Sequence, residues 1–221
     1  MGASGLWLTV FALGAAAGSA VAEEPVASPA SPSLQLGGFV DGVFAYNFNR
    51  PADHANFLPG LGTSAKRDNE VTVNLAQVDF VLAPEPVGFK LSLGFGTAPE
   101  VVHAAEVRGI ATHPEIWRHV VQASAQWQTQ AGRGLLLEAG IFPSHIGMES
   151  FQTHLNWNYT RSWLGELSPY YQTGIKAAYP FSDRWSGQLH LLNGWQVIGD
   201  NNRGKTVGAQ VAYAADKVSF S

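Results

Sequence analysis

The chain has 221 residues, a formal net charge of −4 and a sequence pI near 5.9. Nucleic-acid binding needs a basic surface that displaces counterions from phosphates, and this charge balance, with no Lys- or Arg-rich run, excludes that class of partner. Only 14% of the residues are charged, below the roughly 25% of soluble proteins, and the absence of cysteine removes every cysteine-based metal, redox or nucleophile site.

Residues 1–22 form an apolar segment that is short for a membrane span and ends in Ala20-Val21-Ala22. An apolar run followed by an A-x-A site is typical of a secretory signal peptide; an N-terminal anchor is the alternative, because the start lacks the usual Lys or Arg. Residues 23–33 are rich in Pro, Ser and Ala and predict a linker. No other run of about 18 apolar residues follows, so we expect an exported chain without a transmembrane helix.

Residues 34–221 are predicted to form β-strands joined by loops. The first alternating segment, 34–49, is imperfect, and a long polar loop over 49–69 follows it. In residues 70–82 the apolar side chains change from one parity to the other, which predicts a bulge or twist near Ala76-Gln77. The apolar positions in that segment are Val71, Val73 and Leu75, followed by Val78, Phe80 and Leu82.

Residues 87–96 show strict alternation. Phe89 and Leu91 share one parity with other apolar residues, whereas Lys90 shares the opposite parity with Ser and Gly. Such a strand has one apolar face, which either a dry protein core or lipid must cover. The residues that follow, 99–119, are predicted to be a loop with a helical turn.

The same alternation returns in residues 120–128, 134–142, 170–181, 184–192 and 205–214. This gives about eight strands, each near the ~9 to 11 residues that a tilted strand needs to cross a bilayer. Their polar parity carries mostly Gln, Ser, Thr and Gly, whereas the exposed face of a soluble sheet normally carries many charges. Aromatic residues gather toward the strand ends, as an interfacial girdle would: Trp127, Phe142, Tyr170, Tyr171, Tyr179, Phe181, Trp185 and Trp195.

These patterns predict an all-β fold, an antiparallel transmembrane β-barrel over residues 34–221. In that fold the apolar parity meets lipid and the polar parity surrounds water. The alternative is a secreted soluble β-barrel or sandwich that binds a ligand in its cavity, in which the apolar parity packs a dry core.

Residues 143–169 interrupt the strand pattern for too long to be an ordinary hairpin loop. Long irregular segments in compact domains are usually functional or disordered. Trp157, Tyr159 and Trp163, together with the low charge of the segment, argue against disorder. We expect residues 143–169 to fold into the lumen of the barrel and to narrow it.

Five blocks of sequence together resemble one known family, the OmpL-like outer-membrane β-barrel porins of Gram-negative bacteria. The resemblance covers essentially the whole chain after residue 33. It implies a transmembrane β-barrel of the porin type in the outer membrane, with a water-filled pore for passive diffusion of small solutes or ions. Membrane lipid and these solutes are the implied partners, and formation of a homo-oligomer is left open. The blocks are GFVDGVFAYNFNRP (38–51), NWNYTRS (156–162), SPYYQTGIKAAYPFSDRWSG (168–187), LLNGW (191–195) and DNNRGKT (200–206).

Members of that family are usually longer than this chain. The chain stops at DKVSFS, where a further strand begins. Sheet edges exposed to hydrocarbon are not tolerated, because their backbone groups have no partner there. We therefore expect the chain to be an N-terminal fragment of a barrel, with its sheet incomplete or open.

The polar parity supplies candidate residues for a pore lining, since charged and polar side chains set the field that a passing ion meets. Arg161 on the irregular segment has two interpretations: it contributes to selectivity, or it pairs with a carboxylate of the barrel wall and fixes the segment. The predicted lumen-facing residues are Lys90, Glu138, Lys176, Gln188 and His190, and those on the predicted constriction are Glu149, His154, Arg161 and Glu166.

Enzymatic and metal chemistry find little support in the sequence. None of the seven histidines belongs to an H-E-x-x-H or similarly tight ligand spacing. The stretch GDNNRG lacks the downstream glutamate of a calcium loop, and no G-x-S-x-G occurs. The sequence therefore predicts no metal, no cofactor and no enzymatic activity.

Overall fold

The computed structural model describes residues 33–56, 62–106, 113–215 and 218–220. The predicted signal peptide and all but the last residue of the predicted linker lie outside these ranges.

The described chain is an all-β fold with nine antiparallel strands in one sheet, ordered as in the sequence. Each of the eight predicted segments forms one strand, and a short ninth strand follows them, so the predicted fold class is confirmed. The strands are β1 (Gln35–Ala45), β2 (Glu70–Leu82), β3 (Val87–Phe95), β4 (Val120–Gln128), β5 (Leu136–Pro143), β6 (Tyr171–Pro180), β7 (Trp185–Leu192), β8 (Thr206–Ala215) and β9 (Val218–Phe220).

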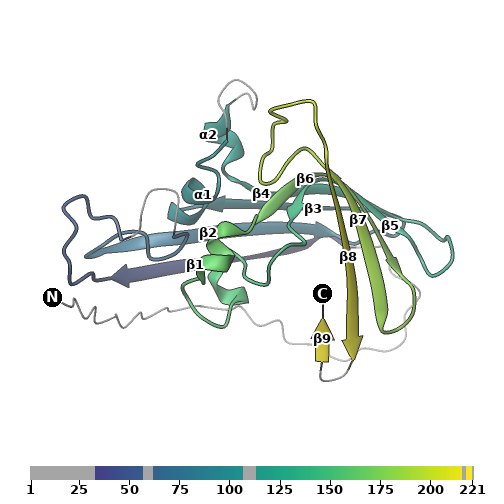
Figure 1. The fold of residues 1–221 in the computed structure, drawn as a ribbon, viewed down its shortest axis with the longest axis horizontal. Helices are drawn as coiled ribbons and strands as arrows, with labels where there is room; N and C mark the ends of the chain where they lie inside the picture. The colour runs from purple at the N-terminus through teal and green to yellow at the C-terminus, as the bar shows by residue number, and fades with distance from the viewer. Residues whose placement is uncertain (1–32, 57–61, 107–112, 216–217, 221) are drawn as a thin grey trace.

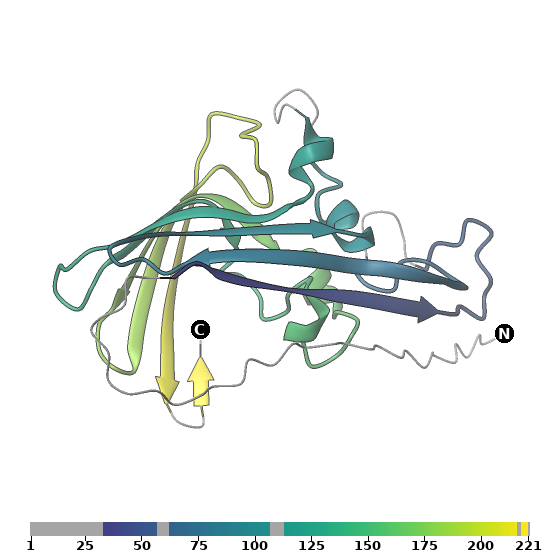
Figure 2. The same ribbon diagram turned by 180° about the vertical axis from the view of Figure 1, so that it is seen from behind.

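The sheet is strongly curled and open. Figures 1 and 2 show β7 and β8 running steeply across the direction of β1 and β2, as the accumulated twist of many strands requires. Among the described strands, β1 pairs only with β2, and β9 pairs only with β8.

Connections alternate between long and short along the chain, so the two ends of the sheet differ. At one end the short connections are residues 83–86, 129–135 and 181–184. Outer-membrane barrels share this asymmetry, with short turns on the periplasmic side and long loops outside. The long connections at the other end are residues 46–69, 96–119, 144–170 and 193–205, and they hold α1 (Thr97–Val102), α2 (Pro114–Trp117), the 3-10 turn η1 (Thr153–Leu155) and α3 (Trp163–Leu167).

The two faces of the sheet have opposite chemistry. We call the face on which residues 144–170 pack the inner face, and the other the outer face. Inner-face side chains are mainly polar and many are buried, among them Gln77, Gln126 and Glu138. Outer-face side chains are mainly apolar and exposed, including Leu36, Val40, Val71, Val78, Phe89, Trp127, Ile175, Leu189, Leu191, Val207 and Val211. This is the reverse of a soluble sheet, whose apolar face is the buried one.

The predicted bulge in β2 exists but lies two residues earlier than expected. Asp41 pairs with Leu75 and Gly42 pairs with Val73, so Asn74 is the extra residue. The shift keeps Val73 on the outer face and turns Leu75 to the inner face, where it is fully buried. The prediction that Leu75 shares a face with Val71 and Val73 is therefore wrong, because the bulge falls between them.

The buried apolar residues gather on the inner face at the long-loop end. Leu75 of β2 and Val121 of β4 pack there with Val102 of α1 and with Phe151. The same cluster contains Tyr171, so the long connections are held to the sheet by a small dry core.

Only some of the aromatic residues predicted to form a girdle are exposed at a strand end, as a girdle requires. Trp127, Phe181 and Trp185 are exposed at the short-turn end of the sheet. Phe142 and Tyr171 are instead almost fully buried, as is Tyr170. The two tyrosines pack with residues of the long connections, and Phe142 lies against side chains of β6 and β7. The prediction is wrong for these three residues.

Candidate functional site

A row of polar side chains crosses the inner face of β4, β5, β6 and β7. The strand registers place Gln126 beside Glu138, Glu138 beside Lys176, and Lys176 beside His190. Residues that pair in neighbouring strands point to the same face of a sheet, so these side chains converge.

Glu138 is the centre of this row, and its carboxylate is fully partnered although only 3% of the residue is exposed. Its Oε2 lies 2.6 Å from Lys176 Nζ. Its Oε1 accepts a hydrogen bond of 2.6 Å from Ser124 Oγ and a longer one of 3.4 Å from Gln122. A buried charge is tolerated when paired and hydrogen-bonded in this way.

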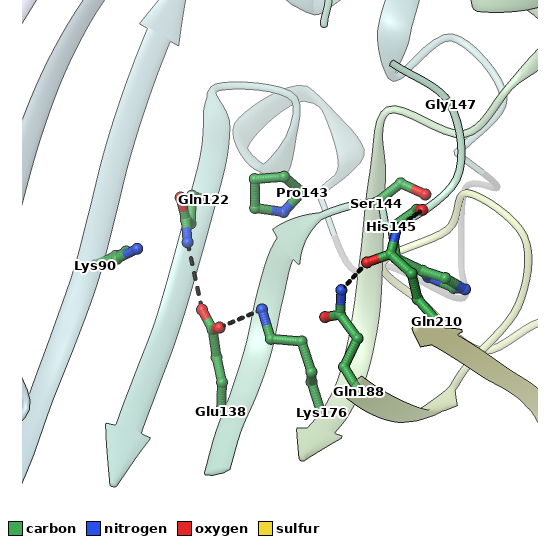
Figure 3. A pocket seen from close by; sticks show the side chains of 10 residues that line it. All are labelled: Lys90, Gln122, Glu138, Pro143, Ser144, His145, Gly147, Lys176, Gln188 and Gln210. Atoms are coloured by element: carbon green, nitrogen blue, oxygen red, sulfur yellow. Dashed lines mark hydrogen bonds and ion pairs between the residues drawn. The ribbon is translucent and has the colours of Figure 1, made fainter. Parts of the chain in front are cut away.

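A polar cavity of about 320 Å³ opens over this row. Figure 3 shows Lys90 and Gln122 on one side of it and Gln188 and Gln210 on the other, with the Glu138–Lys176 pair between them. The remaining lining residues are Pro143, Ser144, His145 and Gly147, from the end of β5 and the connection that follows it.

His145 fastens that connection to the wall of the sheet. Its Nδ1 lies 3.0 Å from Gln172 Oε1, and its backbone oxygen accepts a hydrogen bond of 3.0 Å from Gln210. Its ring stacks on His190 with 4.0 Å between ring centroids. The ring has room because β8 carries Gly208 there, where a Cβ atom would lie 2.6 Å from His145 Cε1.

His190 is on the predicted face but does not line the cavity. It is buried under the ring of His145, and neither ring nitrogen has a hydrogen-bond partner in the described part of the chain. Lys90, Glu138, Lys176 and Gln188, the other four residues predicted from the strands, surround the cavity together.

Asp41 of β1 anchors the irregular segment to the inner face. Its carboxylate accepts hydrogen bonds from Thr153 (2.8 Å) and Tyr159 (3.0 Å) as well as from Asn74 (2.7 Å). Burial and the adjacent Asp41 carboxylate raise the pKa of the Tyr159 hydroxyl, which therefore stays a donor. Gln152 adds a second contact, donating to Gln77 at 2.8 Å.

Arg161 is held by its own segment rather than by the wall. Its Nε donates to the backbone oxygen of Ser150 at 2.7 Å, and its Nη1 to that of Tyr159 at 3.4 Å. Among the described residues it forms no ion pair with a carboxylate, and its Nη2 is buried without a hydrogen-bond partner. Burial lowers the pKa of the guanidinium. The interpretation that Arg161 pairs with a wall carboxylate is therefore wrong.

The other three residues predicted on the constriction lie apart from one another, and each contacts a different partner. Glu149 accepts hydrogen bonds from the backbone and hydroxyl of Ser162, which stabilises the start of α3. Glu166 accepts from the backbone and hydroxyl of Thr63 at 3.0 and 3.1 Å, joining two long connections. His154 is exposed and packs edge-on against the ring of Phe39.

A second packed region at the long-loop end involves His103, which follows α1. Its ring stacks on Tyr171 at 4.4 Å between centroids and is almost completely buried. Burial, with a smaller effect of nearby His119, lowers the pKa of His103 to about 4, so the ring is neutral at physiological pH. This region is packing between a loop and the sheet rather than part of the polar cavity.

The predicted pore lining left out four residues that build the site: Asp41, Gln122, His145 and Gln210. Gln122 and Gln210 are predicted on the polar face of their strands, but were not among the predicted lining residues. Asp41 is likewise one of the alternate positions of β1 that point to the inner face. The position of His145 depends on how the connection after β5 folds back, and strand alternation carries no information on that.

Side chains that could hold a metal ion do not form groups of three or more in the described ranges. No helix in the same ranges is long and apolar enough to cross a membrane.

A protein-family model described as "Putative beta-barrel porin-2, OmpL-like" matches residues 33–221. Neither the curated proteins nor the solved structures contain a match to this chain.

Proposed function

We propose, because the chain belongs to this family of OmpL-like β-barrel porins, that it contributes to a water-filled channel for passive diffusion of small solutes or ions. The membrane in this proposal is the bacterial outer membrane, which the chain would reach through the predicted signal peptide. Diffusion requires no chemical step, so no residue has a catalytic role.

One observation carries the proposal: the apolar face of the sheet is the exposed one. Leu189 is 64% and Val207 75% exposed, whereas Gln126 and Glu138 on the opposite face are 5% and 3% exposed. Soluble proteins rarely expose a continuous apolar surface that extends over many strands. Lipid is the solvent in which this arrangement is stable, with water on the polar side.

The polar cavity and the irregular segment would form the narrow part of the channel. Lys90, Glu138, Lys176 and Gln188 would line it, and residues 143–169, fastened through Asp41 and His145, would reduce its cross-section. A passing ion would then meet a wall of amides with few charges.

Reconstitution into planar lipid bilayers tests this proposal. We expect the full-length protein to insert from detergent and to produce stepwise, roughly ohmic current increments. In fractionated cells it should require detergent for extraction from the outer membrane. Release with the periplasmic contents, and no current steps at any voltage, would contradict the channel and favour a soluble ligand-binding β protein.

A further inference from the structure

The charges around the inner-face cavity do not balance. Its lining contains two lysines, Lys90 and Lys176, and one carboxylate, Glu138; the other side chains are neutral amides, a serine, a proline and His145. The cavity therefore carries at least one net positive charge, although the whole chain has a formal net charge of −4.

The two lysines differ in what they contact. Lys176 Nζ lies 2.6 Å from Glu138 and also stands 4.9 Å from the centre of the Phe142 ring, so its charge is neutralised locally. Lys90 has neither an ion pair nor a hydrogen bond within the described part of the chain. Figure 3 shows its side chain projecting into the cavity from β3. Lys90 is thus the cation that remains available to a solute.

Two further acidic residues of the inner face, Asp41 of β1 and Asp79 of β2, do not line the cavity. Within the described residues neither forms an ion pair with Lys90. The Asp41 carboxylate accepts three side-chain hydrogen bonds, and Asp79 accepts one from Gln77 at 2.7 Å. Both are engaged in holding the β1–β2 part of the wall and the segment that covers it.

We propose that the inner-face cavity is an anion-preferring subsite and that Lys90 is its specificity-determining residue. This inference rests on the proposed channel function. The solutes favoured are small inorganic or organic anions, which approach the ammonium of Lys90 while the amides of Gln122, Gln188 and Gln210 replace part of their hydration. In a wet pore, one unpaired charge within about 5 Å of the ion path changes the local anion concentration roughly two- to fivefold.

Reversal potentials across planar bilayers with a KCl gradient test this directly. We expect the wild-type channel to pass chloride over potassium by about two- to fivefold, Lys90→Gln to lower that ratio to near one, and Lys90→Glu to invert it. Lys90 is half-buried and unpartnered, so Lys90→Gln leaves the fold intact.

One control variant separates Lys90 from a lysine outside the cavity. Lys205→Gln removes a lysine of the β7–β8 connection that pairs with Asp200, outside the cavity, and should leave the ratio unchanged.

The outcomes distinguish this proposal from the one on which it rests. Absence of current steps in the wild type contradicts the channel itself. Channels that open but prefer potassium, or whose ratio Lys90→Gln leaves unchanged, contradict only the role of Lys90.

Discussion

At the scale of single residues, strand alternation identified several side chains of the inner face. It could not identify the contacts between them. Lys90, Glu138 and Lys176 stand on the polar parity of their strands and were predicted from it. That Glu138 pairs with Lys176 depends on the register of β5 against β6. The long connection between these strands does not fix that register in the sequence, since only short turns do so.

Asp41 is the residue whose removal should most affect the irregular segment. Asp41→Ala leaves Asn74, Thr153 and Tyr159 without their shared acceptor, and unpaired buried donors cost about 1–3 kcal/mol each. We expect the free energy of unfolding to fall by about 2–4 kcal/mol and the single-channel conductance to rise by at least about 1.5-fold as the segment detaches.

Chemical denaturation in detergent and planar-bilayer recordings measure these two effects. Asp79→Ala is the matched control, because Asp79 is also an inner-face aspartate but, within the described residues, accepts a side-chain hydrogen bond only from Gln77. A conductance of Asp41→Ala equal to that of the control would show that the segment does not restrict the channel.

At the scale of secondary-structure elements, strands could be predicted well and connections poorly. Period-two alternation located β1 to β8, because burial on one face and exposure on the other leave a direct trace in the sequence. The change of parity in β2 predicted a bulge but not its position at Asn74. A bulge at any of several neighbouring positions would produce the same change of parity. The conformation of the long connections depends on tertiary contacts such as that between Glu166 and Thr63. Such contacts join residues far apart in the sequence and leave no local pattern in it.

Neighbouring residues of β7 test which face of a strand meets lipid. Leu189→Arg places a charge on the outer face, where arginine near the bilayer midplane costs about 2–4 kcal/mol. Gln188→Arg places the same charge on the inner face, beside Gln210, and should cost less than about 1 kcal/mol because water solvates it. Denaturant-induced unfolding from lipid vesicles measures both. Equal destabilisation by the two variants, or a larger effect of Gln188→Arg, would be inconsistent with the assigned faces.

At the scale of the whole molecule, three features agree with one another. Long connections gather at one end of the sheet, short turns at the other, and the exposed apolar surface lies between them on the outer face. The composition already indicated an exposed apolar surface. The content of charged residues is too low to cover an ordinary surface in contact with water. The curl of the sheet and the cavity between its inner face and residues 143–147 could not be predicted, since they depend on how all the strands and one connection fit together.

The central claim is that the outer face meets lipid and the inner face meets water, and the cysteine-free chain allows this to be measured cleanly. Single cysteines at Leu189, Val207 and Val211 report on the outer face, and at Lys90 and Gln210 on the inner face. Each variant is labelled with a thiol-reactive fluorophore, refolded into vesicles, and exposed in turn to brominated lipid and to aqueous iodide. We predict quenching by brominated lipid at the three outer positions and by iodide at the two inner ones. Iodide quenching at Leu189, Val207 and Val211, with Lys90 and Gln210 quenched by brominated lipid or by neither agent, would contradict the account.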